Sequence, residues 1–183
     1  EGTIYFLLDL LIKKLIYDKS IIDELVVIDG GSKDNTKTLC SSFKEVNFYD
    51  QKDILSNFKL PNKGKGEALW KSLYVTKSDI VIYVDADIKN FDERFVVGIL
   101  GPMLLDQDIK FVKGYYERPY IPGNGEVSYE GGRVTEICAR PLLNMLYPEL
   151  SGFIQPLGGE YGGYRNVLEN IVFTSGYSVE VQS

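Results

Sequence analysis

Two short apolar runs, each followed directly by an aspartate, constrain the fold more than any other feature of the sequence. The first occupies residues 25–28 and precedes Asp29, and the second occupies residues 80–84 and precedes Asp85. Runs of this length that are apolar throughout and rich in β-branched residues are typical of strands buried on both faces of a sheet. Segments with helical spacing separate them. We therefore expect an α/β fold with a mostly parallel sheet flanked by helices.

The remaining pattern fits the same alternation of strands and helices. Leucine and isoleucine spacing predicts a helix over residues 7–16, and a glycine-rich loop leads into strong helix formers over 64–74, where Trp70 is expected to anchor the helix in the core. Further strands are expected at 46–49 and 109–116, and further helices at 92–105 and 134–146. The glycine-rich residues 158–163 favour neither element. Without a repeat or a linker, residues 1–183 are expected to form one domain.

Composition excludes several classes of function. The 183 residues carry a formal charge of −6, which argues against a nucleic-acid-binding protein because such proteins need basic surfaces to bind phosphates. The apolar stretch 4–16 is interrupted by charges and too short to cross a bilayer. Two isolated cysteines fit a reducing compartment, so we expect a cytoplasmic protein with no membrane partner. With no histidine, acid, base and metal-ligand roles fall to carboxylates, lysine and tyrosine.

The two aspartates that end strands point to a site. Ligands of parallel sheets bind at the carboxyl ends of strands, where Asp29 and Asp85 are expected to lie. Asp85 also begins an Asp-Ala-Asp triplet that ends at Asp87, and two carboxylates at that spacing can hold a divalent cation. The alternative is a capped strand end without metal. A second pair, Asp106 and Asp108, follows no strand and is interpreted as a solvated loop.

Two glycine-rich segments could bind anions. Lys65 lies between Gly64 and Gly66 at an expected helix start, where backbone N–H groups and an ammonium can bind a phosphate, although a flexible helix entry explains the same residues. Arg133 and Thr135 follow a glycine pair and suit a phosphate or carboxylate, although a glycine turn with a threonine cap is an equal alternative.

Taken together in order and spacing, six segments resemble the glucosyl-3-phosphoglycerate synthases. They are residues 64–70, 85–87, 131–136 with 139–143, 155–157, 159–161 and 176–180. The resemblance runs essentially from end to end of the chain. It implies the Rossmann-like GT-A fold and transfer of glucose from UDP-glucose, or another nucleoside diphosphate glucose, to 3-phosphoglycerate with retention at the anomeric carbon.

The resemblance also implies roles for individual residues. Donor-nucleotide contacts fall on Asp29, Gly30, Lys65, Asp85 and Ala86, and the ligand of a divalent cation, Mg²⁺ or Mn²⁺, falls on Asp87. The acceptor phosphoglycerate falls on Gly132, Arg133 and Thr135. Leu157 and Glu180 belong to the catalytic centre, and Tyr177 lies with Glu180 around the transferred glucose.

The resemblance further implies a homodimer, and it implies that the sequence is part of a longer enzyme. The family's first strand and nucleotide loop would precede Glu1, and a histidine that completes the metal site would follow Ser183. The domain is accordingly expected to be truncated at both ends. Two other functions stay open: a sugar-phosphate nucleotidylyltransferase, which would release pyrophosphate, and a nucleotide-sugar-binding module without catalysis.

Overall fold

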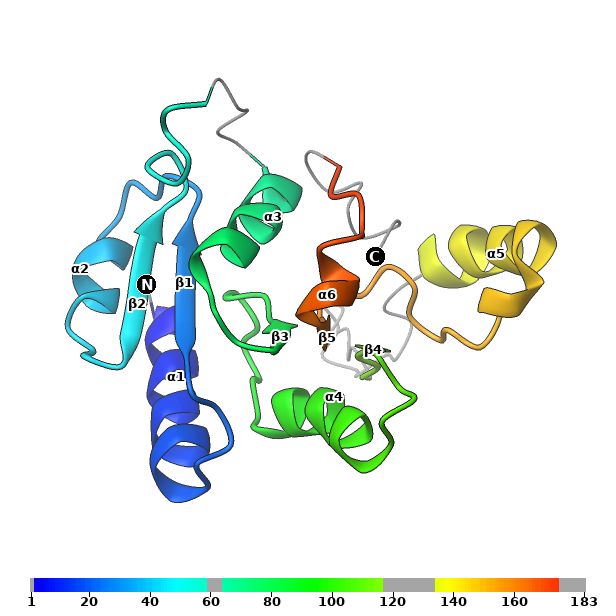
Figure 1. Cartoon of the computed structure of the whole chain (residues 1–183), viewed down its shortest axis with the longest axis horizontal. Helices are drawn as coiled ribbons and strands as arrows, with labels where there is room; N and C mark the ends of the chain where they lie inside the picture. The colour runs from blue at the N-terminus through cyan, green and yellow to red at the C-terminus, as the bar shows by residue number, and fades with distance from the viewer. Residues whose placement is uncertain (1, 59–63, 117–133, 175–183) are drawn as a thin grey trace, which may run out of the picture.

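The structure is a computed structural model that describes residues 2–58, 64–116 and 134–174 (Figure 1). Its first part alternates helices and strands as expected. The elements in this part are α1 (Gly2–Leu11), the π-helical stretch η1 (Ile12–Asp18), β1 (Leu25–Asp29), α2 (Thr36–Cys40) and β2 (Val46–Asp50). β1 and β2 pair in parallel, from Leu25 opposite Val46 to Asp29 opposite Asp50.

A second group of strands follows an order that the sequence did not predict. The elements are α3 (Lys65–Val75), β3 (Ile80–Tyr83), α4 (Arg94–Leu105), β4 (Phe111–Lys113), η2 (Thr135–Ala139), α5 (Arg140–Leu146), the 3₁₀ turn η3 (Pro148–Leu150), β5 (Tyr161–Tyr164) and α6 (Arg165–Leu168). β5 lies between β3 and β4 and is antiparallel to both, so β3 and β4 run in the same direction on either side of it. The glycine-rich segment thus supplies a strand that joins two others.

The missing side chain of Gly162 explains why a glycine-rich segment can serve as this central strand. A Cβ atom at Gly162 would lie 2.8 Å from Ile99 of α4 and 2.9 Å from Ile82 of β3. The space is taken by these apolar neighbours, and α4 packs closely against β5 as a result. Strand propensity therefore mattered less here than close packing.

The hydrophobic core has two centres, one for each group of strands. In the first, α1 and η1 place Leu7, Leu8, Leu11 and Leu15 against the apolar side chains of β1 and β2. In the second, Tyr161 of β5 is fully buried, and its ring lies 5.1 Å from that of Tyr83 and 5.6 Å from that of Phe111. The aromatic rings of three neighbouring strands therefore pack together. No helix in the described ranges is long and apolar enough to cross a membrane.

Helix α3 shows that the expectation for Trp70 was wrong. The Trp70 side chain is 40% exposed, whereas Glu67 and Lys71 on another face of the helix are buried. Glu67 and Lys71 are four residues apart and share one face, as do Trp70 and Tyr74, so burying one pair exposes the other. The Lys71 ammonium finds a partner on this inward face, the Gln51 carbonyl at 2.9 Å, whereas Glu67 Oε1 lies 3.7 Å from the ammonium and has no hydrogen-bond partner among the described residues.

Candidate functional site

A cavity of about 450 Å³ lies at the carboxyl ends of β1 and β3, where the sequence predicted a site. It brings together five of the predicted donor and metal residues: Asp29, Lys65, Asp85, Ala86 and Asp87. Its other lining residues are Thr3, Ile4, Val27, Ile28, Ser32 and Thr36. Polar groups therefore converge on one cavity from the end of β1, from the start of α3 and from the residues after β3, although β1 and β3 belong to different sheets.

The charges of this cavity meet in an ion pair between Lys65 and Asp85. The Lys65 ammonium lies 2.6 Å from Asp85 Oδ1, and both side chains are partly exposed. Gly64, directly before the helix, has a φ of 121°, a conformation that side chains rarely adopt. This glycine lets the chain turn into α3 so that Lys65, the first helical residue, faces the strand edge.

Gly159, from the later part of the chain, lies beside this ion pair. A Cβ atom at Gly159 would clash with Asp85 Oδ2 and would lie 2.6 Å from the Lys65 ammonium. A side chain at this point would force the Asp85 and Lys65 side chains to move. Residues 159–161 carry part of the family resemblance, but the contact itself has no local signal, because Gly159 and Asp85 are brought together by the insertion of β5.

The Asp29 carboxylate holds the turn that follows β1. Oδ2 accepts the backbone N–H groups of Gly31 at 3.1 Å and Ser32 at 3.0 Å, and the Ser32 hydroxyl donates to Oδ1. Gly31 has a φ of 104°, which a glycine adopts without strain. Gly30 lies exposed beside Asp29 in the same turn. Asp29 thus shapes one wall of the cavity, and Ser32, which sequence reasoning missed, lines it.

Asp87 is exposed and lies in the lining of the cavity, two residues beyond Asp85. Among the described residues, no three acidic, cysteine or histidine side chains come close enough together to hold a metal ion. One or two carboxylates are nevertheless what Mg²⁺ commonly takes from a protein, with substrate phosphates and water completing its shell. The oxygen donors present therefore fit a hard divalent cation that arrives with a phosphate ligand.

The second Asp-x-Asp pair has a local structural role, in agreement with its interpretation as a loop. Asp106 follows the last residue of α4, and its Oδ1 accepts the backbone N–H of Asp108 at 2.9 Å. Neither residue lines the cavity at the strand edge. Position after a buried strand, rather than spacing alone, separates the two pairs.

The predicted acceptor and catalytic residues are described only in part. Leu157 is half-buried and lies two residues before Gly159, and Thr135 is buried at the start of η2. Neither lines the cavity that holds Asp87. Gly132, Arg133, Tyr177 and Glu180 lie outside the described residues.

Side-chain contacts tie the segment before β5 to the end of β4. The Gln155 amide donates to the Tyr116 carbonyl at 2.6 Å, and its oxygen accepts the Tyr116 N–H at 3.5 Å. The Tyr116 hydroxyl donates to buried Glu160 at 3.3 Å, and the Gly114 N–H donates to the Glu160 carbonyl at 2.7 Å. These contacts fix the loop that carries Gly159 beside the ion pair.

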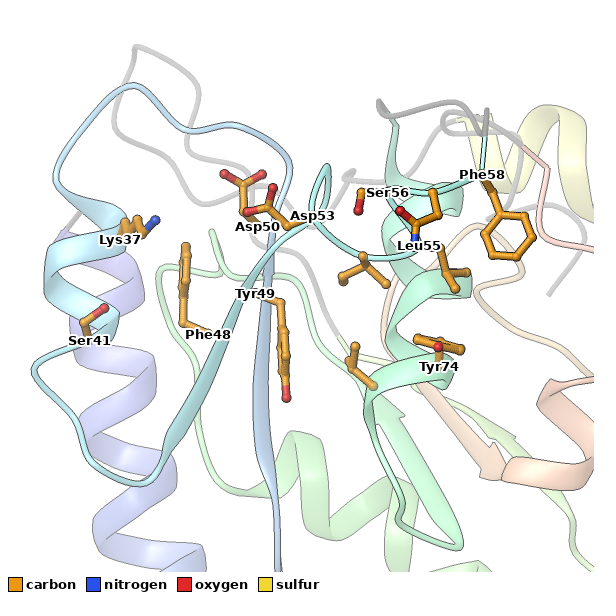
Figure 2. A pocket seen from close by; sticks show the side chains of 13 residues that line it. Lys37, Ser41, Phe48, Tyr49, Asp50, Asp53, Leu55, Ser56, Phe58 and Tyr74 are labelled. Carbon is orange, nitrogen blue, oxygen red and sulfur yellow. The ribbon is translucent and has the colours of Figure 1, made fainter.

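A larger cavity, of about 620 Å³, lies around the end of β2, between residues of α2 and α3 (Figure 2). Phe48 and Tyr49 of β2 and Tyr74 of α3 lie around it with residues of the turn 51–58. None of the predicted site residues that the structure describes lines this cavity. Both cavities hold charged side chains, but the predicted donor and metal residues line only the smaller one, which is therefore the candidate site.

Comparison with known proteins identifies the family. Residues 2–100, more than half of the chain, match the sequence profile of glycosyl transferase family 2. The chain belongs to this family. The matched range includes β1, β3 and the start of α3, so all five predicted residues that line the cavity lie within the part that defines the family.

Relatives and solved structures give a finer comparison. The glucosyl-3-phosphoglycerate synthase of Petrotoga mobilis is 46% identical over 161 residues, which are 88% of this chain and 49% of that protein. The crystal structure of the Mycobacterium tuberculosis synthase with Mn²⁺, UDP-glucose and phosphoglyceric acid has a TM-score of 0.82 at 38% identity, covering 99% of this chain and 58% of that one. Mannosyl-3-phosphoglycerate synthase from Rubrobacter xylanophilus has a TM-score of 0.84 at 38% identity, covering 98% and 54%.

These comparisons confirm the expected GT-A glycosyltransferase fold and the resemblance to the synthases. The chain spans about half the length of the curated relatives it matches. Activity, substrates and assembly of the whole protein are therefore matters for proposal.

Proposed function

We propose that the protein is a glucosyl-3-phosphoglycerate synthase, which transfers glucose from UDP-glucose, or another nucleoside diphosphate glucose, to 3-phosphoglycerate. The observation that carries the proposal is the convergence of Asp29, Lys65 and the Asp85–Asp87 triplet on one cavity at the strand edge. This set offers hydrogen-bond acceptors for a nucleoside, a cation for a diphosphate and oxygen ligands for a metal. The 46% identity to a relative of that name supports the same chemistry.

On this proposal, the nucleotide lies across the carboxyl ends of β1 and β3. Asp29 and Gly30 contact the base, and Asp85 and Ala86 contact the ribose and diphosphate. Lys65 at the first turn of α3 binds a phosphate, where its ammonium and the helix N-terminus act in the same direction. The ammonium that pairs with Asp85 at 2.6 Å is then shared with an incoming phosphate.

The metal role is assigned to Asp87, with Mg²⁺ or Mn²⁺ as the ion. A bound divalent cation would neutralise charge that develops on the diphosphate as it leaves. Asp87 suits this role because its carboxylate is exposed in the cavity lining, whereas the neighbouring Asp85 pairs with Lys65. Lys65 adds a second positive charge at the leaving group.

The acceptor and the glucose are assigned to residues from the later part of the chain. Gly132, Arg133 and Thr135 hold the phosphoglycerate, and Leu157, Tyr177 and Glu180 surround the glucose and the reacting hydroxyl. Much of the acceleration is then positional, because the acceptor hydroxyl is held next to the anomeric carbon. We infer retention by front-face transfer, without a glucosyl-enzyme intermediate. Trapping of a covalent glucosyl adduct would contradict this step.

Replacing Asp87 with alanine tests the site. Asp87→Ala should lower transfer about 100-fold or more, because several kcal/mol of charge stabilisation depend on the metal. The matched controls Asp106→Ala and Asp108→Ala should stay within about threefold of the wild type, as expected for exposed loop positions. Release of UDP and formation of glucosyl-3-phosphoglycerate are measured by chromatography. Equal loss in Asp87→Ala and Asp106→Ala would contradict the assignment.

Product analysis separates the proposal from its alternatives. Pyrophosphate release from a nucleoside triphosphate and a sugar phosphate would identify a nucleotidylyltransferase, and UDP binding without turnover would identify a binding module.

The mannosyl synthase of similar fold favours a second candidate donor, a nucleoside diphosphate mannose. Competition between the two sugar nucleotides at equal concentration decides between glucose and mannose. Sedimentation velocity tests the proposed homodimer, and fractionation of cells tests the proposed cytoplasmic location.

A further inference from the structure

Gln51 lies directly after β2, at the point where the end of β1 meets the start of α3. Its side chain is buried, with the residue only 1% exposed. Its backbone N–H donates to the Asp29 carbonyl at 2.8 Å, which extends the parallel β1–β2 pairing by one bond beyond Asp29 opposite Asp50. The backbone of Gln51 therefore fixes the last residue of β1, whose side chain shapes the cavity wall.

The side chain of Gln51 reaches from this strand end to the start of α3. Nε2 donates to the Gly64 carbonyl at 3.4 Å, immediately before Lys65. Oε1 has no hydrogen-bond partner among the described residues and lies 3.5 Å from the place that a Cβ atom on Gly30 would occupy. The amide thus fills the space between Gly30 and Gly64, the backbone segments that carry two opposite walls of the donor cavity.

The buried ammonium of Lys71 also contacts Gln51, through its backbone carbonyl. Lys71 lies about one and a half turns beyond Lys65 in α3, and its side chain is fully buried. Its ammonium donates to the Gln51 carbonyl at 2.9 Å and lies 3.7 Å from Glu67 Oε1. A buried ammonium is stable only with such partners, so Lys71 restrains both the helix and the residue after β2.

We propose that Gln51 is a positioning residue of the donor site, which sets the distance between the Asp29 turn and Lys65 at the start of α3. It contacts no reacting atom and acts through Asp29 and Gly64. The proposal rests on the proposed function for the class of ligand, a nucleoside diphosphate, because Asp29 and Lys65 must contact opposite ends of one molecule. Misplacing one wall relative to the other weakens both contacts together.

The variant Gln51→Met tests this inference because it keeps the length of the side chain and removes the amide. The backbone bonds to Asp29 and from Lys71 remain possible in this variant. UDP binding in the presence of Mn²⁺, measured by calorimetry, should weaken about three- to tenfold, the effect of losing one buried hydrogen bond that organises the site. The melting temperature should change little, since the unpartnered Oε1 disappears with the amide. A purely structural role would lower the melting temperature and leave UDP affinity within twofold.

Hydrogen exchange gives a readout that needs no ligand. Amides of residues 30–32 and 64–67 should both exchange faster in Gln51→Met than in the wild type, and those of β5 should not. The matched control is Gln107→Met, which makes the same exchange at an exposed position after α4 and should leave both segments and UDP affinity unchanged. Unchanged exchange at both segments would overturn the proposal. Failure of the wild type to bind UDP would refute the proposed function, and the exchange data would still support or overturn the placement of Gln51.

Discussion

Gly159 determines how closely the segment before β5 can approach the Lys65–Asp85 ion pair. The missing side chain leaves its backbone in direct contact with both charged groups. Because peptide groups here line the pair, a ligand phosphate that binds Lys65 also meets this segment. The residue is therefore a steric determinant of the site, although it carries no functional group.

Adding one methyl group at this position should disrupt the donor site. In Gly159→Ala, the new Cβ would lie 2.6 Å from the Lys65 ammonium and closer still to Asp85, so the two side chains must move apart. We expect UDP affinity to fall about tenfold or more, in line with the loss of one or two charge-assisted contacts. Titration calorimetry measures the change. Gly152→Ala is the control, because a Cβ there meets nothing within 4 Å, and equal binding by both variants would contradict the role of Gly159.

Sequence reasoning at single residues succeeded where position in an element decided the outcome. Asp29, Asp85 and Asp87 could be placed together because Asp29 ends the apolar strand β1 and Asp85 and Asp87 come shortly after the apolar strand β3. The exposure of Trp70 could not be predicted. The face that α3 buries is the one that carries Lys71, whose ammonium donates to the carbonyl of Gln51, directly after β2. Gly159 was unpredictable for the same reason, since its neighbours come from distant parts of the chain.

The connection between α3 and β3 is held by two charged side chains from distant elements. Glu24, just before β1, accepts hydrogen bonds from Thr76 and Ser78 and from the Lys77 N–H. Arg165 at the start of α6 donates to the carbonyls of Leu73 at 2.7 Å and Ser78 at 3.0 Å, and also to that of Thr76. Together they satisfy the polar groups of a turn that no regular element pairs, and so they connect β1, β3 and α6.

Because Glu24 holds this turn, the free energy of unfolding should depend on pH. Burial of the Glu24 carboxyl raises its pKa, but its hydrogen bonds with Thr76, Lys77, Ser78 and Asn47 together outweigh that effect, and the net pKa is lowered from 4.5. A lowered folded-state pKa means that the unfolded state takes up the proton more readily. The stability from Glu24 is therefore fully present above pH 4.5 and is lost as the pH falls through the lower folded-state pKa.

Denaturant unfolding of Glu24→Gln at several pH values checks this prediction. The difference in unfolding free energy between wild type and variant should be largest near neutral pH and should shrink below about pH 4.5, the window in which Glu24 gains a proton. Asp23→Asn, next to Glu24 and exposed, serves as the control. A difference that stays constant down to pH 3 would show that the hydrogen bonds of Glu24 do not depend on its charge.

At the level of elements, the sequence predicted the longer helices and the apolar strands but neither α6 nor the central strand of the second group. β1 and β3 have apolar runs that periodicity detects, and β2 is an apolar strand interrupted by the exposed Asn47. β5 has the sequence Tyr-Gly-Gly-Tyr, and its pairing depends on neighbours such as Ile99 that require glycine. The expected strand over 109–116 is also shorter, because only Phe111–Lys113 pair with β5.

For the molecule as a whole, the proposed site predicts that nucleotide and metal stabilise the fold together. Asp87 and Lys65 come from different elements, so a ligand that contacts both favours the native state over the unfolded one. At about 100 times the dissociation constant the gain is about 2.7 kcal/mol, or roughly 5–10 °C in melting temperature for a chain of this size. Differential scanning fluorimetry with UDP, Mn²⁺ or both measures it. An equal shift by UDP in excess chelator would exclude the metal from the site.

The position of β5 between β3 and β4 has a consequence for the order in which the chain can fold during synthesis. β1 and β2 are separated by only 16 residues and can pair as soon as residue 50 is available. β3 and β4 gain their described strand partner only when residues 161–164 emerge, about 80 residues after β3. A nascent chain that ends between these points carries a folded first half and two strands with exposed edges, which are sites of misassociation. We expect ribosome pauses or chaperone contacts that protect these edges to occur while residues 84–160 are being synthesised.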